Sequence, residues 1–153
     1  AELTARRKLP DYRADAVVPD TKLQGWNYIE DSCDINSLMD YFGGFHDSVI
    51  REIHYESGDY MEGGTMYLSP SCAKKLRMVF DSSWANSIEI VFESVRLLRL
   101  VPPGENYLGD LFNASIFIDN LEVYFYDEYL KERPKSHDGT WVKALGMRWR
   151  VIV

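Results

Sequence analysis

Apolar and polar residues alternate along most of the second half of this chain, from Lys74 to the C-terminus. Side chains of a strand point to opposite faces in turn, so a period of two predicts strands with one buried face. The expected inward sets are Leu76, Met78 and Phe80; Ile88, Ile90 and Phe92; Leu121, Val123 and Phe125; and Met147, Trp149 and Val151. We therefore expect strands at 74–81, 87–93, 95–101, 111–119, 121–127 and 141–153.

One segment has helical spacing instead. Apolar residues at positions i, i+3, i+4 and i+7 form a stripe near 35–42, made of Ile35, Leu38, Met39 and Phe42. Asp34 is placed to cap the N-terminus of this helix, and Gly43-Gly44 to end it. The amphipathic helix should pack its apolar stripe against the sheet.

The rest of the first half contains an arm and further strands. The first twenty residues are polar and carry two prolines, so we interpret 1–20 as an irregular arm and 21–153 as a single domain. The remaining patterns predict an edge strand at 22–29, a strand at 45–57, and a hairpin of 60–62 and 65–68 around Gly63-Gly64. One helix followed by consecutive strands favours an α+β fold. Its antiparallel sheet would form a meander, a sandwich or a partly open barrel.

The charge of the chain is acidic and unevenly distributed. A net charge of −7 argues against nucleic acid as a partner, because phosphate binding needs a basic surface. Nine carboxylates lie between Glu30 and Glu62, with Arg51 as the single basic residue of that stretch. Such a block is either a solvated face or a surface for a basic protein partner. For the second case we select Asp40, Asp47, Glu52, Glu56, Asp59 and Glu62 as contact residues.

Two further features concern the location of the protein. No apolar run reaches the ~20 residues of a membrane span, so we expect no membrane contact. Cys33 and Cys72 do not make a disulfide scaffold, and we interpret them as reduced thiols of a cytoplasmic protein.

The densest polar cluster is His46-Asp47-Ser48. It has the residue types of a hydrolase triad, but on a strand His46 and Ser48 would face one side and Asp47 the other. A metal site would need His54 as well, and an extended strand would separate the two histidines by about 26 Å. We expect no metal and no cofactor. A small-ligand or hydrolytic site around His46 and Asp47, with Ser48 and His54 nearby, stays as the alternative function.

Aromatic residues supply a second candidate surface. If Phe125 points inward, then Tyr124 and Tyr126 point outward beside Glu122, and such tyrosines are typical of contact hot spots. A second buried face is the alternative interpretation. His137, in a basic loop beside Asp138, is expected to face solvent.

The segment Gly43-Gly44-Phe45-His46-Asp47-Ser48-Val49-Ile50, followed by Ile53-His54-Tyr55-Glu56-Ser57-Gly58, resembles a group of small bacterial proteins of unassigned function. These carry a Phe-His-Asp-Ser segment ahead of a β-rich body, and some are similar to the immunity proteins that accompany bacterial toxins. The resemblance covers roughly 43–153 and implies a non-enzymatic binding protein. Our leading hypothesis is thus a bacterial cytoplasmic protein-binding module with an acidic and aromatic face. A homo-oligomer paired through edge strands is a further alternative.

Overall fold

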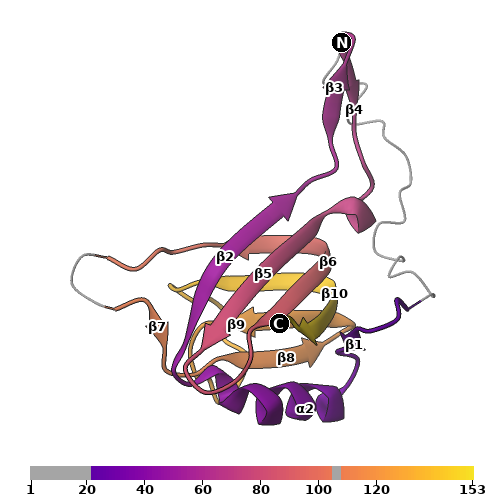
Figure 1. The fold of residues 1–153 in the computed structure, drawn as a ribbon. Coiled ribbons are helices and arrows are strands. Elements are labelled where there is room, and N and C mark those ends of the chain that lie inside the picture. Colours follow the sequence, from indigo (N-terminus) through magenta and orange to yellow (C-terminus); the bar gives the residue numbers. More distant parts are fainter. Residues whose placement is uncertain (1–21, 105–107) are drawn as a thin grey trace.

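The computed structural model describes residues 22–104 and 108–153 of the chain, and the arm expected at 1–20 lies outside the described residues. An eight-stranded, mostly antiparallel sheet curls into a half-barrel with one helix against it, so the α+β prediction with a partly open barrel is confirmed (Figure 1). The strands are β1 (Asn27–Tyr28), β2 (Ser48–Glu56), β5 (Lys75–Ser82), β6 (Ile88–Arg99), β7 (Asp110–Leu111), β8 (Ser115–Asp119), β9 (Glu122–Tyr126) and β10 (Trp141–Val151). Their order is β7-β2-β5-β6-β10-β9-β8, with β1 paired to β10.

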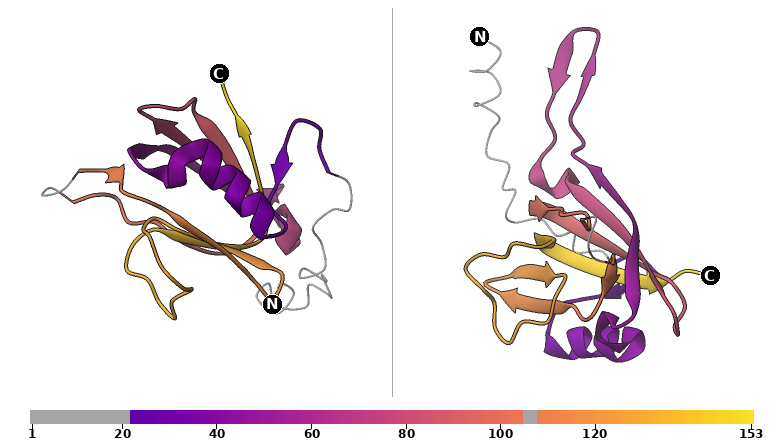
Figure 2. Two further views of the ribbon diagram at one scale, coloured as in Figure 1. Left: turned by 90° about the horizontal axis from the view of Figure 1, so that it is seen from below. Right: turned by 90° about the vertical axis from the view of Figure 1, so that its left-hand side faces the viewer.

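The helix α2 spans Ser32–Phe42 and closes one end of the half-barrel (Figure 2). Its N-cap is Asp31 rather than the predicted Asp34. The two residues form a reciprocal capping box, in which each carboxylate accepts the other residue's backbone N–H, at 2.9 and 3.2 Å. The helix ends as predicted at Gly43, whose left-handed φ of 59° and close approach to the Trp84 ring leave no room for a Cβ. No described helix is long and apolar enough to cross a membrane.

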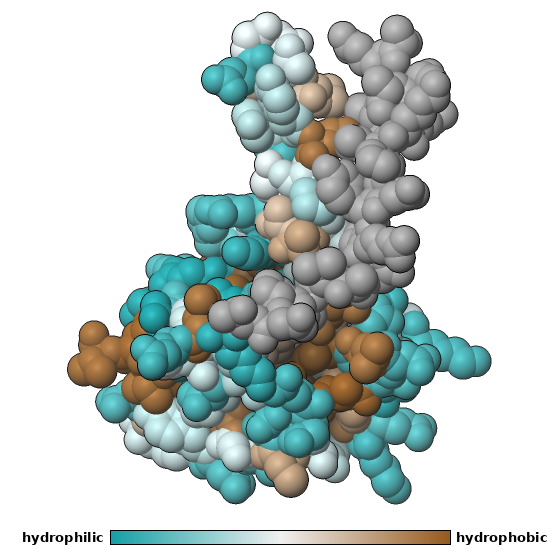
Figure 3. Space-filling model, turned by 90° about the vertical axis from the view of Figure 1, so that its right-hand side faces the viewer, coloured by the Kyte–Doolittle hydropathy of each residue, from teal (hydrophilic) through white to brown (hydrophobic). Residues whose placement is uncertain are grey.

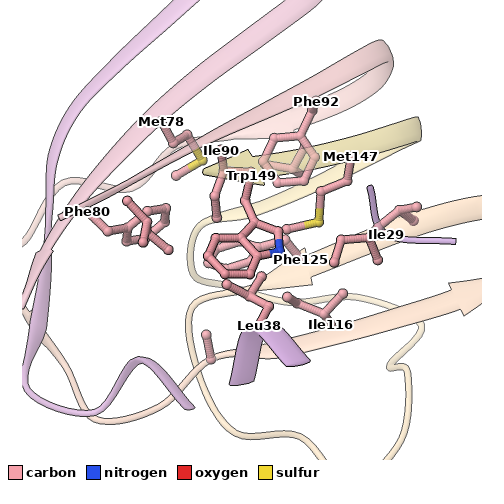
Figure 4. Close-up of a cluster of buried hydrophobic side chains, with 14 of the residues drawn as sticks. Ile29, Leu38, Met78, Phe80, Ile90, Phe92, Ile116, Phe125, Met147 and Trp149 are labelled. Atoms are coloured by element: carbon pink, nitrogen blue, oxygen red, sulfur yellow. The ribbon is translucent and has the colours of Figure 1, made fainter. Parts of the chain in front are cut away.

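The core lies between α2 and the concave face of the sheet. Leu38 and Phe42 of the helix are fully buried, and Leu38 faces Trp149, Phe125 and Ile116 (Figure 4). The alternating residues of β5, β6 and β10 occupy this core as their period predicts. The alternation places Leu121 in the core, but the residue lies in the β8–β9 turn with φ 66° and is 87% exposed.

Several strand boundaries differ from the pattern. The predicted strands at 87–93 and 95–101 are one strand, β6, which continues through Ser94 although that residue has φ 52°. The predicted strand at 111–119 is two, β7 and β8, which lie at opposite ends of the sheet order. Only Asn27–Tyr28 of the predicted edge strand at 22–29 pairs with the sheet, through two residues of β10.

The predicted hairpin is present and stands apart from the sheet. Strands β3 (Tyr60–Glu62) and β4 (Thr65–Tyr67) pair only with each other among the described residues. Gly63 and Gly64 form the turn with φ of 57° and 81°, conformations that favour glycine. The hairpin projects away from the end of the half-barrel opposite α2 (Figures 1 and 2).

Candidate partner-binding surface

The Phe-His-Asp-Ser segment forms the junction between the 3₁₀ turn η2 (Gly43–Phe45) and β2. Phe45 is fully buried at φ 69°, and Asp47 has φ 56°. The Asp47 backbone N–H donates to the Leu111 carbonyl at 3.1 Å, which ties the junction to β7. The segment therefore has a clear structural role, since it turns the chain from the helix into the sheet.

Ser48 and one nitrogen of His46 contact backbone carbonyls, and the side chains of His46 and Asp47 contact each other. Ser48 is 1% exposed, and its hydroxyl donates to the Phe45 carbonyl at 2.6 Å. Nδ1 of His46 lies 2.9 Å from the Phe112 carbonyl oxygen, and Nε2 lies 3.5 Å from Oδ2 of Asp47. A buried hydroxyl that already donates to a carbonyl is not available as a nucleophile, so the geometry gives no support to hydrolysis by Ser48.

The structure does not bring His54 to this junction. His54 lies farther along β2, where Nε2 is 3.1 Å from Oε1 of Glu56. Within residues 22–104 and 108–153, no group of three or more His, Cys, Asp or Glu side chains is arranged to hold a metal ion.

The six selected carboxylates extend along the molecule instead of forming one compact face. Asp40 and Asp47 lie near the α2 end, Glu52 and Glu56 follow β2, and Asp59 and Glu62 belong to the hairpin region at the other end (Figure 1). Two of them contact a cationic side chain, Glu52 with Arg77 and Asp59 with Lys74, and Asp47 and Glu56 lie within 3.5 Å of His46 and His54. The acidic block in the sequence thus overstates the unpaired charge on the surface.

Charges on the convex face of the central strands are balanced in the same way. Glu89, 5% exposed, contacts both Arg77 and Arg150, and Glu93 contacts the buried Arg148. Burial acts to raise the pKa of Glu89, but the two guanidinium groups lower it below its usual value on balance. This face is an internally neutralised ion-pair network, which leaves little charge for a partner.

Tyr124 and Tyr126 are on the face opposite the core, as expected, but they are not exposed. Their relative exposures are 5% and 1%, because residues 127–140, the covering loop, fold over them. The Arg133 guanidinium lies 4.5 Å from the Tyr124 ring centre, and Trp141 stacks on Tyr126 at 5.4 Å. Burial raises the pKa of both tyrosines. The prediction of an exposed aromatic strip at Tyr124 and Tyr126 is therefore wrong, and the structure fits the alternative interpretation of a second buried face.

His137 holds the covering loop in place. The sequence pattern predicts that His137 faces solvent, but the structure buries it. Its side chain is 7% exposed, and Nε2 lies 2.7 Å from Oδ1 of Asp127. The other oxygen of Asp127 accepts the Thr140 backbone N–H at 3.1 Å. These bonds close the two ends of the loop on each other, so the loop covers the tyrosines as a fixed layer.

A cluster of exposed aromatic and methionine side chains lies on the hairpin. Tyr60, Met61, Met66 and Tyr67 are 54%, 60%, 40% and 43% exposed. Tyr60 pairs with Tyr67 and their rings stack at 4.9 Å, whereas Met61 pairs with Met66. Residues directly opposite on paired strands share a face, so one face of the hairpin carries tyrosines and the other carries methionines. Figure 3 shows the hairpin standing above the body of the molecule.

A signal for this surface exists in the sequence. Each hairpin strand has two consecutive large apolar residues, Tyr60-Met61 and Met66-Tyr67, so neither face is polar. The two-residue Gly-Gly turn connects the two strands directly, so no other segment lies between them. Large side chains on both faces of a short hairpin therefore predict an exposed apolar surface, which is typical of interaction sites.

The base of the hairpin is clamped to the body by polar contacts. Oδ1 of Asp59 accepts the Ser69 backbone N–H at 2.7 Å and lies 3.0 Å from Nζ of Lys74. The same ammonium group donates to the Ser57 carbonyl at 2.8 Å. An isolated two-stranded hairpin is only marginally stable in water, so this clamp and the tyrosine stack give it a defined shape.

A scan against protein-family models finds no match to this chain, and searches of curated proteins and of solved structures find none either.

Proposed function

We propose that this protein is a non-enzymatic binding module that recognises a protein partner through the β3–β4 hairpin. The observation that carries the proposal is the exposure of four large apolar side chains, Tyr60, Met61, Met66 and Tyr67, on a clamped projection. Tyrosine is enriched among interface hot spots, and methionine adapts its shape to a partner surface.

The charge around the hairpin supports a basic partner. From Glu52 to Ala73 the chain has four carboxylates and no Lys or Arg, although Glu52 contacts Arg77 and Asp59 contacts Lys74. Glu62 lies beside the turn and makes no ion pair among the described residues. A partner with Lys or Arg around an apolar cleft would match both the side chains and the charge of the hairpin.

An immunity-like role is the narrower form of this proposal. The Phe-His-Asp-Ser segment supports it, through its resemblance to proteins similar to toxin-immunity proteins. In that form the partner is a basic toxin enzyme, which loses activity when the hairpin occupies its cleft. The two free cysteines support a reducing compartment, the bacterial cytoplasm, as the site of this encounter.

Site-specific photo-crosslinking tests the proposal. A benzophenone amino acid replaces Met61 in one variant of the full chain and Leu121, 87% exposed in the β8–β9 turn, in a matched control. Both variants are irradiated in lysate of the source organism. We expect one discrete adduct from position 61, absent from position 121, and mass spectrometry identifies the crosslinked protein.

The identified protein is then purified for calorimetry. We expect Tyr60→Ala and Glu62→Lys each to weaken binding at least tenfold, and Glu62→Lys also to reduce the dependence of affinity on salt. Adducts of equal yield at positions 61 and 121, or a partner whose affinity is unchanged in both variants, would contradict the proposal.

A further inference from the structure

A groove of about 760 Å³ runs beside the free edge of β2. Five consecutive residues, 49–53, line it. The pairing of β2 with β5 shifts between Ile50 and Glu52, so the strand is irregular at Arg51. The groove touches Ile50 and Ile53, which pack against the core, and also Glu52, which contacts Arg77, so it borders both faces of β2 and lies along its edge.

This edge of β2 is paired over only a fraction of its length. β7 pairs with it at Ser48 and Val49. No other described strand pairs with the same edge from Ile50 to Glu56. Backbone N–H and C=O groups on such an edge are a template for another strand.

The opposite wall of the groove is apolar and unusually exposed. It contains Leu100, Leu108 and Phe112, whose exposures are 50%, 80% and 76%, and Pro102 and Pro103. Clustered apolar side chains at this exposure are typical of interaction sites. An occupant long enough to follow the strand edge would cover all of them.

Carboxylates give the groove its polarity. Glu52, Asp110, Asp127 and Glu128 line it, with Arg51 as the one guanidinium group among the lining residues. Arg51 contacts Asp81 at 3.2 Å, and Glu52 contacts Arg77. Asp110 makes no ion pair within the described part of the chain, and the side chain of Glu128 is 61% exposed although Oε1 lies 3.3 Å from Nδ1 of His137. Basic side chains of an occupant would find acceptors here.

We propose that this groove binds an extended peptide segment with alternating apolar and basic side chains, which adds to the edge of β2 as a new strand. The bound peptide pairs with β2 beyond Val49, where the pairing with β7 ends. Its apolar side chains pack on Leu108 and Phe112, and its basic side chains contact Asp110 and Glu128. This is a second binding surface, separate from the hairpin, and strand addition to an open sheet edge is an established mode of peptide recognition.

Peptide selection tests the inference. A display library of random nine-residue peptides is panned against the full chain, with counter-selection on Phe112→Glu, a substitution at an exposed side chain. Leu121→Glu, at the exposed β8–β9 turn, is the matched control. We expect enriched peptides to alternate apolar and basic residues, to lose at least tenfold in affinity for Phe112→Glu, and to bind Leu121→Glu normally.

Hydrogen exchange on the complex gives the readout for strand addition. With the best peptide bound, we expect slower exchange of backbone amides within 50–56 and no change within β3 and β4. An N-methylated version of the peptide, which lacks backbone donors at alternate positions, should bind at least tenfold more weakly.

Three outcomes would overturn the inference. They are an absence of enriched peptides, equal binding to Phe112→Glu, and protection confined to the hairpin. If no peptide is enriched and phenethylammonium shifts the amide resonances of 49–53, the groove is a small-cation site and not a strand-addition site. The hairpin is untouched by Phe112→Glu, so failure of the groove and failure of the proposed partner contact are distinguishable.

Discussion

The molecule has two stacked tyrosine pairs with opposite surroundings. Tyr124 and Tyr126 lie with their rings nearly parallel at 6.5 Å, and Tyr60 and Tyr67 lie almost parallel at 4.9 Å. The first pair is under the covering loop at 5% and 1% exposure, and the second is 54% and 43% exposed on the hairpin. Residue type and strand position therefore do not distinguish a covered aromatic pair from an exposed one. The segment that folds over the pair makes the difference.

The largest expected effect is a loss of folding stability when the covered pair is altered. Tyr126→Ala should lower the free energy of unfolding by about 3–5 kcal/mol, because a fully buried ring leaves a cavity between Trp141 and His137. Urea unfolding followed by tryptophan fluorescence measures this loss. Tyr126→Phe keeps the ring and is the matched control. A loss below about 1 kcal/mol for the alanine variant would mean that the covering loop does not pack on the ring.

Alkaline pH gives the next effect on the covered pair. Burial is the main cause that raises the pKa of Tyr124 and Tyr126 above the ordinary value of 10.0. Above that pH the unfolded chain releases these protons and the folded chain keeps them. The free energy of unfolding should therefore be unaffected below about pH 9 and fall above about pH 10, by up to ~1.4 kcal/mol per pH unit for each tyrosine.

The double variant Tyr124→Phe/Tyr126→Phe checks this pH effect. Urea unfolding at a series of alkaline pH values should give a flatter decline for the variant than for the native chain. Equal slopes for the two proteins would assign the decline to other groups.

The clamp at the base of the hairpin should have a smaller global effect. Asp59→Asn weakens the contact with Lys74 and should lower the free energy of unfolding by only about 0.5–1 kcal/mol. The local result is larger, since amide protons within 60–67 should exchange faster as the hairpin loses its anchor. Glu62→Gln, near the turn, is the control and should leave exchange in both strands unchanged. Equal exchange rates in the two variants would show that the clamp does not hold the hairpin.

The smallest stability change is expected at the exposed pair. Tyr60→Ala should alter the free energy of unfolding by less than about 1 kcal/mol, because the ring is half-exposed and has mainly Tyr67 as its neighbour. The same variant should still lose partner affinity as described above. A loss of about 2 kcal/mol or more in urea unfolding would mean that another molecule, such as a second copy of the chain, covers this ring in solution.

Most elements of the fold could be predicted from the sequence because their signals are local. The helical spacing of Ile35, Leu38, Met39 and Phe42, the alternation in β5, β6 and β10, and the Gly-Gly turn of the hairpin depend on neighbours within one element. The errors occur where two elements meet. Asp34 is a good capping residue, but Asp31 takes the cap and Asp34 completes the capping box. The pattern at 111–119 continues through a break at which the chain crosses from one edge of the sheet to the other.

The candidate binding surfaces were predicted less well than the fold. The acidic stretch includes Glu56, Asp59 and Glu62, which lie on or near the hairpin, but a count of carboxylates does not show that Asp59 is paired with Lys74. The aromatic prediction selected the covered tyrosines instead of the exposed ones. The groove beside β2 joins residues of β2, of 100–103 and 108–112, and of the covering loop, and no short motif connects them.

The chain's own pattern of residues is enough to establish an antiparallel sheet, an amphipathic helix and a hairpin with apolar side chains on both faces. Each of these follows from spacing along a few consecutive residues. The exposure of a given aromatic pair and the openness of the β2 edge follow from contacts between distant segments, such as Asp127 with His137 and Ser48 with Leu111. Burial is a property of what lies on top of a side chain, and the covering segment is specified by long-range packing that local periodicity does not encode.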